Sequence, residues 1–324
     1  MSTRSFSVGG VRFQAASPDG ALPDFLTYLD STIVLNGQPA DGGTQSEIRL
    51  HVQRSGSAPP ADKREELLHR STSLSIWALT TGYELVAGET RVIVHEDRDQ
   101  AELFLHDSLW KLPLPDQREL LVLSFLMLLR RRQRFGLHAN AVASNQRCLL
   151  IAGPSGSGKT SLSLCFIQQG WRFTSDDASL LRPLDGHVEV QAFRRGFSCP
   201  TTTLRHIRAL HPESGKALPG DKRLVDLAEV MPEQFMPCCR PEVLLFPEIV
   251  SAERSTVTKR SPSGALTGLM AQSPGIMTDV ASATRQSAVL ADLVRQTRSY
   301  RIRLGRDVFE SPEDLASLVE SLEA

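Results

Sequence analysis

The chain has 324 residues, which is enough for two domains and for a sizeable buried core. Its 36 basic and 37 acidic residues give a formal net charge of -1, so composition favours neither nucleic acid nor an anionic membrane as a partner. The five cysteines show no paired CxxC spacing, which argues against a disulfide framework and against a zinc site.

Two features bear on where the protein works. The first residues lack the uninterrupted apolar segment of an export signal. The longest apolar run, residues 120–129, is about half of the roughly 20 residues that cross a bilayer as a helix. We therefore expect a cytoplasmic protein that has no membrane partner.

Residues 1–110 are expected to form an α+β domain of their own. Short apolar stretches typical of strands alternate with loops rich in Gly, Pro, Asp and Ser. No motif in this part carries chemistry, so we expect it to recognise the substrate or to hold an oligomer together. The expected strands lie within 47–52, 73–88, 90–96 and 101–107, and the expected loops at 36–45 and 54–64.

Residues 111–324 are expected to form an α/β P-loop domain that opens with a helix. Asp116 followed by Glu119 fits a capping box at the start of this helix. The arginines at 130–134 fall in its last turn, where positive charge complements the helix dipole. A role of these arginines in binding phosphate or an acidic partner is the alternative.

Two apolar stretches joined by residues 144–147 come next and predict a β-hairpin. A tight turn at Asn145 and Gln146 would place His138 opposite Gly153. A shift of one residue would turn the histidine to the other face of the hairpin.

A Walker A nucleotide-binding loop follows the hairpin. Residues 153–160 match G-x-x-x-x-G-K-[ST], between an apolar strand and a helix that Gly170 ends. Backbone N–H groups of such a loop surround phosphate oxygens, while Lys159 would reach the β and γ phosphates and the Thr160 hydroxyl would bind Mg²⁺. The residues expected to bind ATP are Gly153, Pro154, Ser155, Gly156, Ser157, Gly158, Lys159, Thr160 and Ser161.

A strand within 171–175 then leads to two adjacent carboxylates, Asp176 and Asp177. The carboxyl ends of neighbouring strands in an α/β sheet converge on the phosphate site. Phosphoryl transfer to a hydroxyl needs one carboxylate near the acceptor proton and usually another near the metal. Alternatively, the two aspartates only cap the next turn.

The rest of the chain is expected to alternate strands, loops and helices. The polar segment 253–275 is expected to be a lid or an interdomain loop. The final helix would have Ser311 as its cap and Pro312 at its first position. The other expected elements are strands at 187–193, 240–250 and 299–305, a loop that leads into a helix at 194–210, and helices at 286–297 and 311–323.

Residues 135–180 resemble the catalytic domain of HPr kinase/phosphorylase and its bacterial serine kinase relatives. His138, the loop at 153–160, Gly170 and the Asp176–Asp177 pair match this family in order and spacing. The resemblance is looser from residue 180 to the C-terminus and does not extend over residues 1–110.

The resemblance implies an ATP-dependent, Mg²⁺-requiring serine kinase whose catalytic residues include Lys159. It further implies that Asp176 is the general base on the acceptor hydroxyl, that Asp177 belongs to the metal and hydrogen-bond network, and that His138 supports the base. The metal would thus lie by Thr160 and Asp177.

The family's Arg-Gly signature corresponds to Arg195 and Gly196. Arg194 and Arg195 are therefore candidates for contact with the acceptor or with phosphate, although both could equally be solvated. The acidic residue that precedes this signature in the family falls at Phe193, so its metal contact is absent or comes from elsewhere, with Glu189 as the candidate. The family's downstream loop for dephosphorylation has no match.

The sequence therefore predicts a kinase that uses ATP and Mg²⁺ to phosphorylate a hydroxyl, expected to be a serine, of a protein, peptide or small molecule. A second copy of the chain is a further candidate partner. The alternative is a nucleotide-binding regulator or assembly switch with little or no phosphotransfer.

Overall fold

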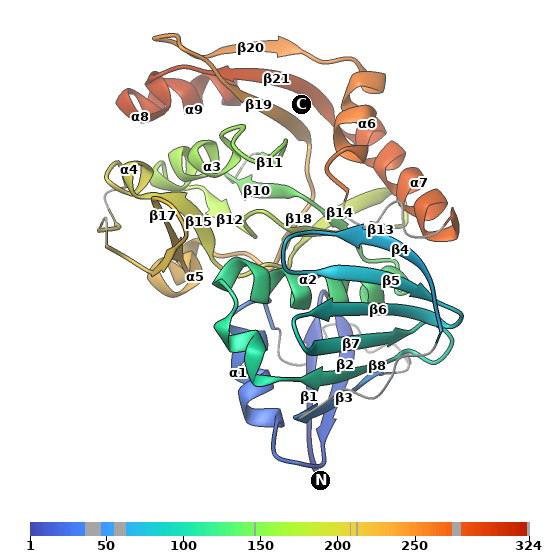
Figure 1. Ribbon diagram of the computed structural model, residues 1–324. Coiled ribbons are helices and arrows are strands. Elements are labelled where there is room, and N and C mark those ends of the chain that lie inside the picture. The colour runs from blue at the N-terminus through green and yellow to red at the C-terminus, as the bar shows by residue number, and fades with distance from the viewer. Residues whose placement is uncertain are drawn as a thin grey trace. The chain divides into compact units, whose positions relative to one another are not determined.

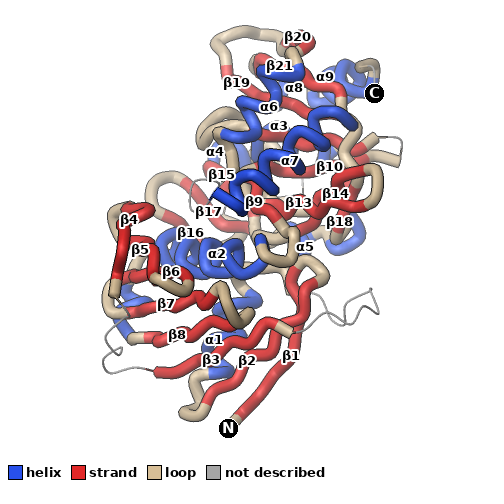
Figure 2. The backbone as a smooth tube through the Cα atoms, turned by 90° about the vertical axis from the view of Figure 1, so that its right-hand side faces the viewer, coloured by secondary structure: helices blue, strands red, loops and turns tan. Residues whose placement is uncertain are grey.

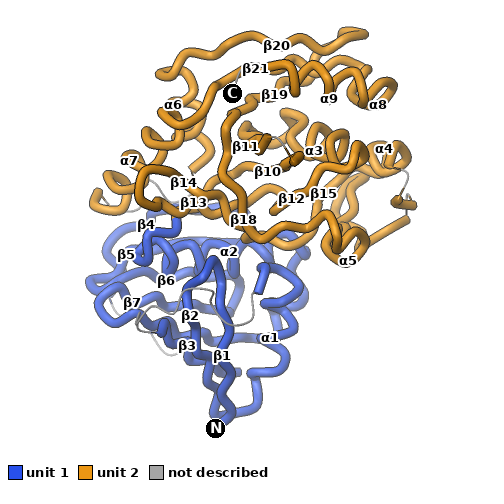
Figure 3. Tube along the Cα trace, turned by 180° about the vertical axis from the view of Figure 1, so that it is seen from behind, with its two compact units in different colours: residues 1–134 blue, residues 135–324 orange. Residues whose placement is uncertain are grey.

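The computed structural model describes residues 1–35, 47–54, 63–145, 147–207, 209–211, 213–273 and 280–322. Its contacts divide the chain into two compact units, Met1–Arg134 and Phe135–Ala324 (Figure 3). Both units combine helices with sheets, so the protein is of mixed α/β class with several sheets (Figure 1). No helix in the described ranges is both long and apolar enough to cross a membrane.

Unit 1 contains an eight-stranded sheet in the order β1-β2-β3-β8-β7-β6-β5-β4. All the strands expected in this part are present, as β3, β5, β6, β7 and β8. The loop expected at 36–45, and residues 55–62 of the second loop, lie outside the described residues. The strands are Ser2–Val8 (β1), Val11–Ser17 (β2), Ile48–Arg54 (β3), Arg64–Arg70 (β4), Ser75–Leu79 (β5), Gly82–Ala87 (β6), Thr90–His95 (β7) and Gln100–Leu105 (β8), and the helices Leu22–Asp30 (α1), Asp107–Lys111 (a 3-10 turn) and Leu114–Arg130 (α2).

Helix α2 belongs to unit 1, whereas the sequence placed the domain boundary before it, at residue 110. The helix packs against β6 and β7, so its contacts are with the first unit. The capping-box prediction is wrong, because α2 begins at Leu114 after Pro113 and Asp116 lies inside its first turn. Proline is tolerated in a first turn, where backbone N–H groups have no helical partner.

The arginines at the end of α2 form ion pairs within unit 1. Arg130 lies 2.6 Å from Glu96, and Arg132 lies 2.8 Å from Asp99. The Arg134 side chain donates to the backbone oxygen of Gly9 at 2.8 Å. The last turn of α2 contains Arg130, whereas residues 131–134 follow the helix, so the expected complement to the helix dipole applies to Arg130. The contacts of Arg132 and Arg134 are structural but of another kind.

Unit 2 is built on a six-stranded sheet in the order β12-β10-β11-β19-β21-β20, in which β11, β19 and β21 run parallel. Two smaller sheets, β18-β14-β13-β9 and β15-β17-β16, complete it. The strands are Phe135–Leu137 (β9), Ala139–Ala143 (β10), Cys148–Ala152 (β11), Arg172–Phe173 (β12), Ser179–Leu184 (β13), His187–Ala192 (β14), Phe197–Pro200 (β15), Lys216–Leu218 (β16), Lys222–Val225 (β17), Cys238–Cys239 (β18), Val243–Ile249 (β19), Thr256–Lys259 (β20) and Arg298–Leu304 (β21).

The helices of unit 2 lie around this sheet, and α6 and α7 pack against each other (Figure 2). The strands expected at 187–193, 240–250 and 299–305 are present as β14, β19 and β21. The helices are Lys159–Gln168 (α3), Thr201–Leu204 (α4), Leu227–Val230 (α5), Pro232–Gln234 (a 3-10 turn), Pro262–Met270 (α6), Val280–Gln296 (α7), Asp307–Glu310 (α8) and Pro312–Glu320 (α9).

The predicted hairpin register is confirmed. Strands β10 and β11 pair Ala139 with Ala152 and Ala143 with Cys148, so the next positions outward are His138 and Gly153. The expected turn residue Gln146 lies outside the described residues. A short connection between two apolar strands was enough to fix which residues lie opposite one another.

The segment expected to be a lid or an interdomain loop, 253–275, is described as far as Ser273 and consists largely of regular elements, so the prediction of a loop is wrong there. Strand β20 pairs with β21, and α6 follows it directly. Ser261 caps α6 by accepting a hydrogen bond from the Gly264 N–H at 3.2 Å. In the last helix, α9, Ser311 occupies the cap position but its side chain makes no cap hydrogen bond.

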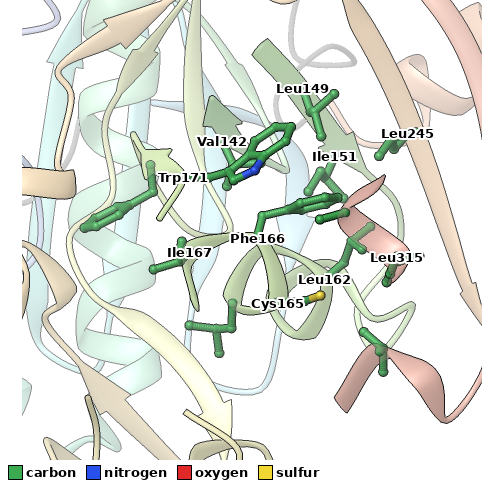
Figure 4. Packing of buried hydrophobic residues seen from close by; sticks show 14 of the residues in the cluster. Val142, Leu149, Ile151, Leu162, Cys165, Phe166, Ile167, Trp171, Leu245 and Leu315 are labelled. Atoms are coloured by element: carbon green, nitrogen blue, oxygen red, sulfur yellow. The ribbon is translucent and has the colours of Figure 1, made fainter. Parts of the chain in front are cut away.

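Helix α3 follows residues 153–158, which we call the phosphate loop. An apolar core surrounds this helix (Figure 4). Phe166 is fully buried, and its ring centroid lies 4.7 Å from that of Trp171. Because α3 is buried on several sides, its position depends on this apolar packing as well as on its ends.

We predict that Phe166→Ala lowers the free energy of unfolding of unit 2 by about 3–5 kcal/mol, because it removes a buried ring and leaves a cavity. Urea unfolding followed by circular dichroism measures the loss. Val280→Ala, at an exposed apolar residue, is the control and should change stability by less than about 0.5 kcal/mol. Equal effects of the two substitutions would contradict the prediction.

Candidate active site

The phosphate loop joins β11 to α3, as the motif predicts. Gly158 has φ +100° immediately before the helix, in the left-handed region. A Cβ atom there would lie 2.7 Å from Leu304 Cδ1, so a larger residue would clash as well as strain the backbone. Gly170, with φ +84°, follows the C-terminus of α3 as expected.

Lys159 lies over this loop with its side chain 5% exposed. Its Nζ donates to the backbone oxygens of Gly153 at 2.9 Å and Pro154 at 3.2 Å. Burial lowers the pKa of Lys159, and the charges of Asp177 and Asp176 offset part of that effect. The ammonium is therefore held at the loop and close to the two carboxylates.

Asp176 is 1% exposed and both of its carboxylate oxygens accept hydrogen bonds. Oδ1 accepts from Asn140 Nδ2 at 2.7 Å and from Thr160 Oγ1 at 3.0 Å, and Oδ2 accepts from the Ser198 N–H at 3.0 Å. Burial, followed by the neighbouring charge of Asp177, raises the pKa of Asp176 to about 6. This carboxylate faces the phosphate-loop hydroxyl.

Asp177 has the opposite environment, with a side chain that is 34% exposed. Its Oδ1 accepts from His138 Nε2 and lies 3.9 Å from Lys159 Nζ, while Oδ2 lies 2.5 Å from Arg194 Nη1. Burial opposes its ionisation, but the hydrogen bond from His138 and the nearby charges of Arg194 and Lys159 outweigh it. The pKa of Asp177 is therefore held well below its usual range.

Asn140, on β10, is a site residue that the sequence interpretation missed. Its buried Nδ2 also lies 3.0 Å from Ser163 Oγ, and its Oδ1 accepts from the Asp177 backbone N–H at 2.9 Å. The amide thus binds the Asp176 side chain and the Asp177 backbone together. A polar residue inside an otherwise apolar strand was the available signal, since such a group needs buried partners.

Gln272 is a second missed residue. Its Oε1 lies 3.1 Å from His138 Nδ1, and its backbone oxygen accepts from the His138 N–H at 2.7 Å. A side-chain amide can accept from or donate to an imidazole nitrogen, depending on its orientation. The residue falls in the segment that was expected to be a lid, so nothing in the local pattern pointed to it.

The two candidate arginines, Arg194 and Arg195, have different partners. Arg195 forms ion pairs with Asp226 and with Glu229, at 3.0 Å for the latter. Arg194 instead reaches Asp177. The structure thus separates two neighbouring arginines that the sequence treated alike.

Phe193, at the position where the sequence interpretation noted a missing acidic residue, is fully buried. Glu189, the candidate replacement, lies on β14, 3.8 Å from Arg182, and accepts from Gln191 Nε2 at 2.9 Å. Its described partners are therefore outside the phosphate loop.

A cavity of about 1050 Å³ opens beside the phosphate loop. Residues 152–157 line it together with residues from β19, β20, β21, α6 and the segments on either side of α6. This volume suits a nucleotide-sized ligand. The lining includes Ser155 and Gly156 of the phosphate loop and also Gln272, which contacts His138. The cavity therefore extends from the phosphate loop to Gln272.

Comparisons with known proteins give little additional information. No family model matches the chain, and no curated protein matches it. A solved structure, the Hpr(Ser) kinase/phosphatase from Coxiella burnetii, aligns at 13% sequence identity over 57% of this chain and 93% of that one, with a TM-score of 0.30. A TM-score of this size does not establish a shared fold, so the function has to be inferred from the residues of this chain.

We predict that Asp176 makes the metal-free protein less stable as the pH rises. Its folded pKa of about 6 lies above the ordinary 3.8, so its stabilising contribution is present below the ordinary value and is lost as the pH rises through the folded one. The stability of Asp176→Asn minus that of the wild type should therefore be larger at about pH 7.5 than at about pH 4.5. Thermal unfolding in EDTA measures this.

Asp97→Asn, at an exposed aspartate, is the control and should differ from wild type by the same small amount at both pH values. A difference between Asp176→Asn and wild type that does not change with pH would show that the carboxyl group titrates normally.

Proposed function

We propose that the chain is an ATP-dependent kinase that transfers the γ-phosphoryl group to a hydroxyl. The observation that supports this best is the 3.9 Å separation between Lys159 Nζ, at the phosphate loop, and Asp177 Oδ1, on an ionised and partly exposed carboxylate. A group that holds the transferred phosphate and a group that can contact the acceptor therefore lie side by side, as phosphoryl transfer requires.

In this proposal Asp177, rather than Asp176, contacts the acceptor hydroxyl. The oxygens of both carboxylates have protein hydrogen-bond donors, but Asp176 is 1% exposed, so an acceptor could not reach it without displacing the residues that cover it. Asp177 is accessible and lies against Lys159. The assignment differs in this respect from the one that the family resemblance implies.

The low pKa of Asp177 is compatible with such a role. The transition state of phosphoryl transfer is loose, so little proton removal is needed before the phosphorus–oxygen bond to the leaving group is largely broken. Asp177 would orient the hydroxyl and accept its proton late. His138 and Arg194 would keep the carboxylate pointed at the acceptor.

The residues fit a magnesium ion, because the available donors are the Thr160 hydroxyl and two carboxylates, and Mg²⁺ prefers oxygen ligands. Thr160 Oγ1 donates its hydrogen to Asp176 Oδ1, which leaves the lone pairs of its oxygen for the ion. Thr160 and Asp177 would hold the ion. When bound, Mg²⁺ neutralises charge on the β and γ phosphate oxygens.

The acceptor class comes from the resemblance of residues 135–180 to HPr kinases, which favours a serine hydroxyl of a protein, peptide or small molecule. Unit 1 would then recognise that acceptor or mediate oligomerisation. A nucleotide switch with little phosphotransfer is the second candidate, and the buried Phe193 at the family's acidic position favours it.

We predict that Asp177→Asn reduces phosphoryl transfer by about 10²-fold or more while ATP binding is retained, because the acceptor loses its general base. The measurement is transfer of label from γ-labelled ATP into the protein, peptide and small-molecule fractions of a lysate of the source cells. Asp185→Asn, in an exposed turn, is the control. Unchanged transfer by Asp177→Asn would remove this residue from the mechanism, and ATP binding without transfer by the wild type would favour the switch.

We predict that Lys159→Ala lowers turnover by about 10²-fold or more, because the developing phosphoryl charge loses a positioned cation. Steady-state assays separate the effect on kcat from that on KM. The acceptor in these assays is unlabelled material of the lysate fraction that receives label from ATP. Lys111→Ala, in unit 1, is the control. Near-normal turnover would mean that this loop is not the catalytic nucleotide site.

A further inference from the structure

Arg260 forms part of the cavity wall. Its guanidinium carbon lies 4.1 Å from the centroid of the Phe246 ring. Both residues line the cavity, together with residues 153–157 of the phosphate loop. A planar cation thus lies over an aromatic ring, and both line the cavity that the phosphate loop also lines.

Gly268 of α6 leaves the room for this stack. A Cβ atom at position 268 would lie 2.8 Å from Phe246 Cε1 and 3.0 Å from Arg260 Nη2. Contacts this short would force the ring or the guanidinium to move. The helix therefore approaches the stack closely because residue 268 has no side chain.

We propose that the Arg260–Phe246 stack is the subsite for the base of the nucleotide. The inference rests on the proposed nucleotide-dependent function and adds to it the group that recognises the base. Arginine guanidinium planes stack on nucleobases as they do on aromatic side chains. With one face of Arg260 against Phe246, the other face can receive a base whose phosphates lie at the loop.

Charge alone does not decide between a base and a phosphate at Arg260. Lys259, Arg260 and Arg301 line the cavity together with Glu248, which is paired with Arg301. Phosphates have a better site at the loop, where backbone N–H groups, the start of α3 and Lys159 converge.

The test compares binding of MgATP with binding of magnesium tripolyphosphate, which carries the phosphates without a base, by calorimetry. Arg260→Met and Arg260→Lys should each weaken ATP by about tenfold, since both lose the planar group. Tripolyphosphate affinity should stay unchanged. Gly268→Ala should act in the same direction, and Arg254→Met, at an arginine that is 79% exposed, is the control and should change neither ligand.

Several results would overturn the proposal. Equal weakening of both ligands by Arg260→Met would place Arg260 at the phosphates, and retention of full ATP affinity by Arg260→Lys would show that charge, not stacking, matters. Equal affinity of the wild type for ATP and tripolyphosphate would exclude a base subsite while leaving the phosphate loop intact. Binding of neither ligand by the wild type would instead contradict the proposed function itself.

Discussion

The buried amide of Asn140 is the contact on which the rest of the site depends. Two adjacent carboxylates repel each other, and burial adds to the cost of ionising both. Asn140 donates to the Asp176 side chain and accepts from the Asp177 backbone N–H. One amide therefore holds both the Asp176 carboxylate and the main chain of Asp177 in place. The two carboxyl groups then divide by their other surroundings. Burial raises the pKa of Asp176, whereas at Asp177 the hydrogen bond from His138 and the charge of Arg194 outweigh burial and lower the pKa.

The backbone at Asp177 makes this division possible. Its φ of +65° is uncommon for a residue other than glycine. The Ala178 N–H donates to the backbone oxygen of Asp176 at 2.7 Å, which closes a tight turn around Asp177. The sharp turn points the Asp176 side chain at Thr160 and the Asp177 side chain at His138 and Arg194. Strained backbone of this kind persists where surrounding contacts hold it, and the amide of Asn140 supplies one of them.

Local features of the site could be predicted from the sequence, and contacts between distant segments could not. The strand, phosphate loop and helix follow one another directly, and the hairpin register follows from a short turn between apolar strands. Which aspartate is accessible depends on Ser198 and Arg194, which fold back from beyond the next two strands. The prediction of a loop at 253–275 failed for another reason. The segment contains a helix start at Ser261 and Pro262, but its Gly and Ser content was given more weight.

Helix α6 shows why that error matters for function. Its glycine at 268 admits the Arg260–Phe246 stack, and Gln272, just beyond its C-terminus, contacts His138 through both side chain and backbone. The same short helix therefore shapes the cavity wall and supports the histidine that holds Asp177. Any displacement of α6 would change both at once, because packed elements shift as units rather than residue by residue. If the proposed function holds, one element would therefore set both the position of the nucleotide and the orientation of the Asp177 carboxylate.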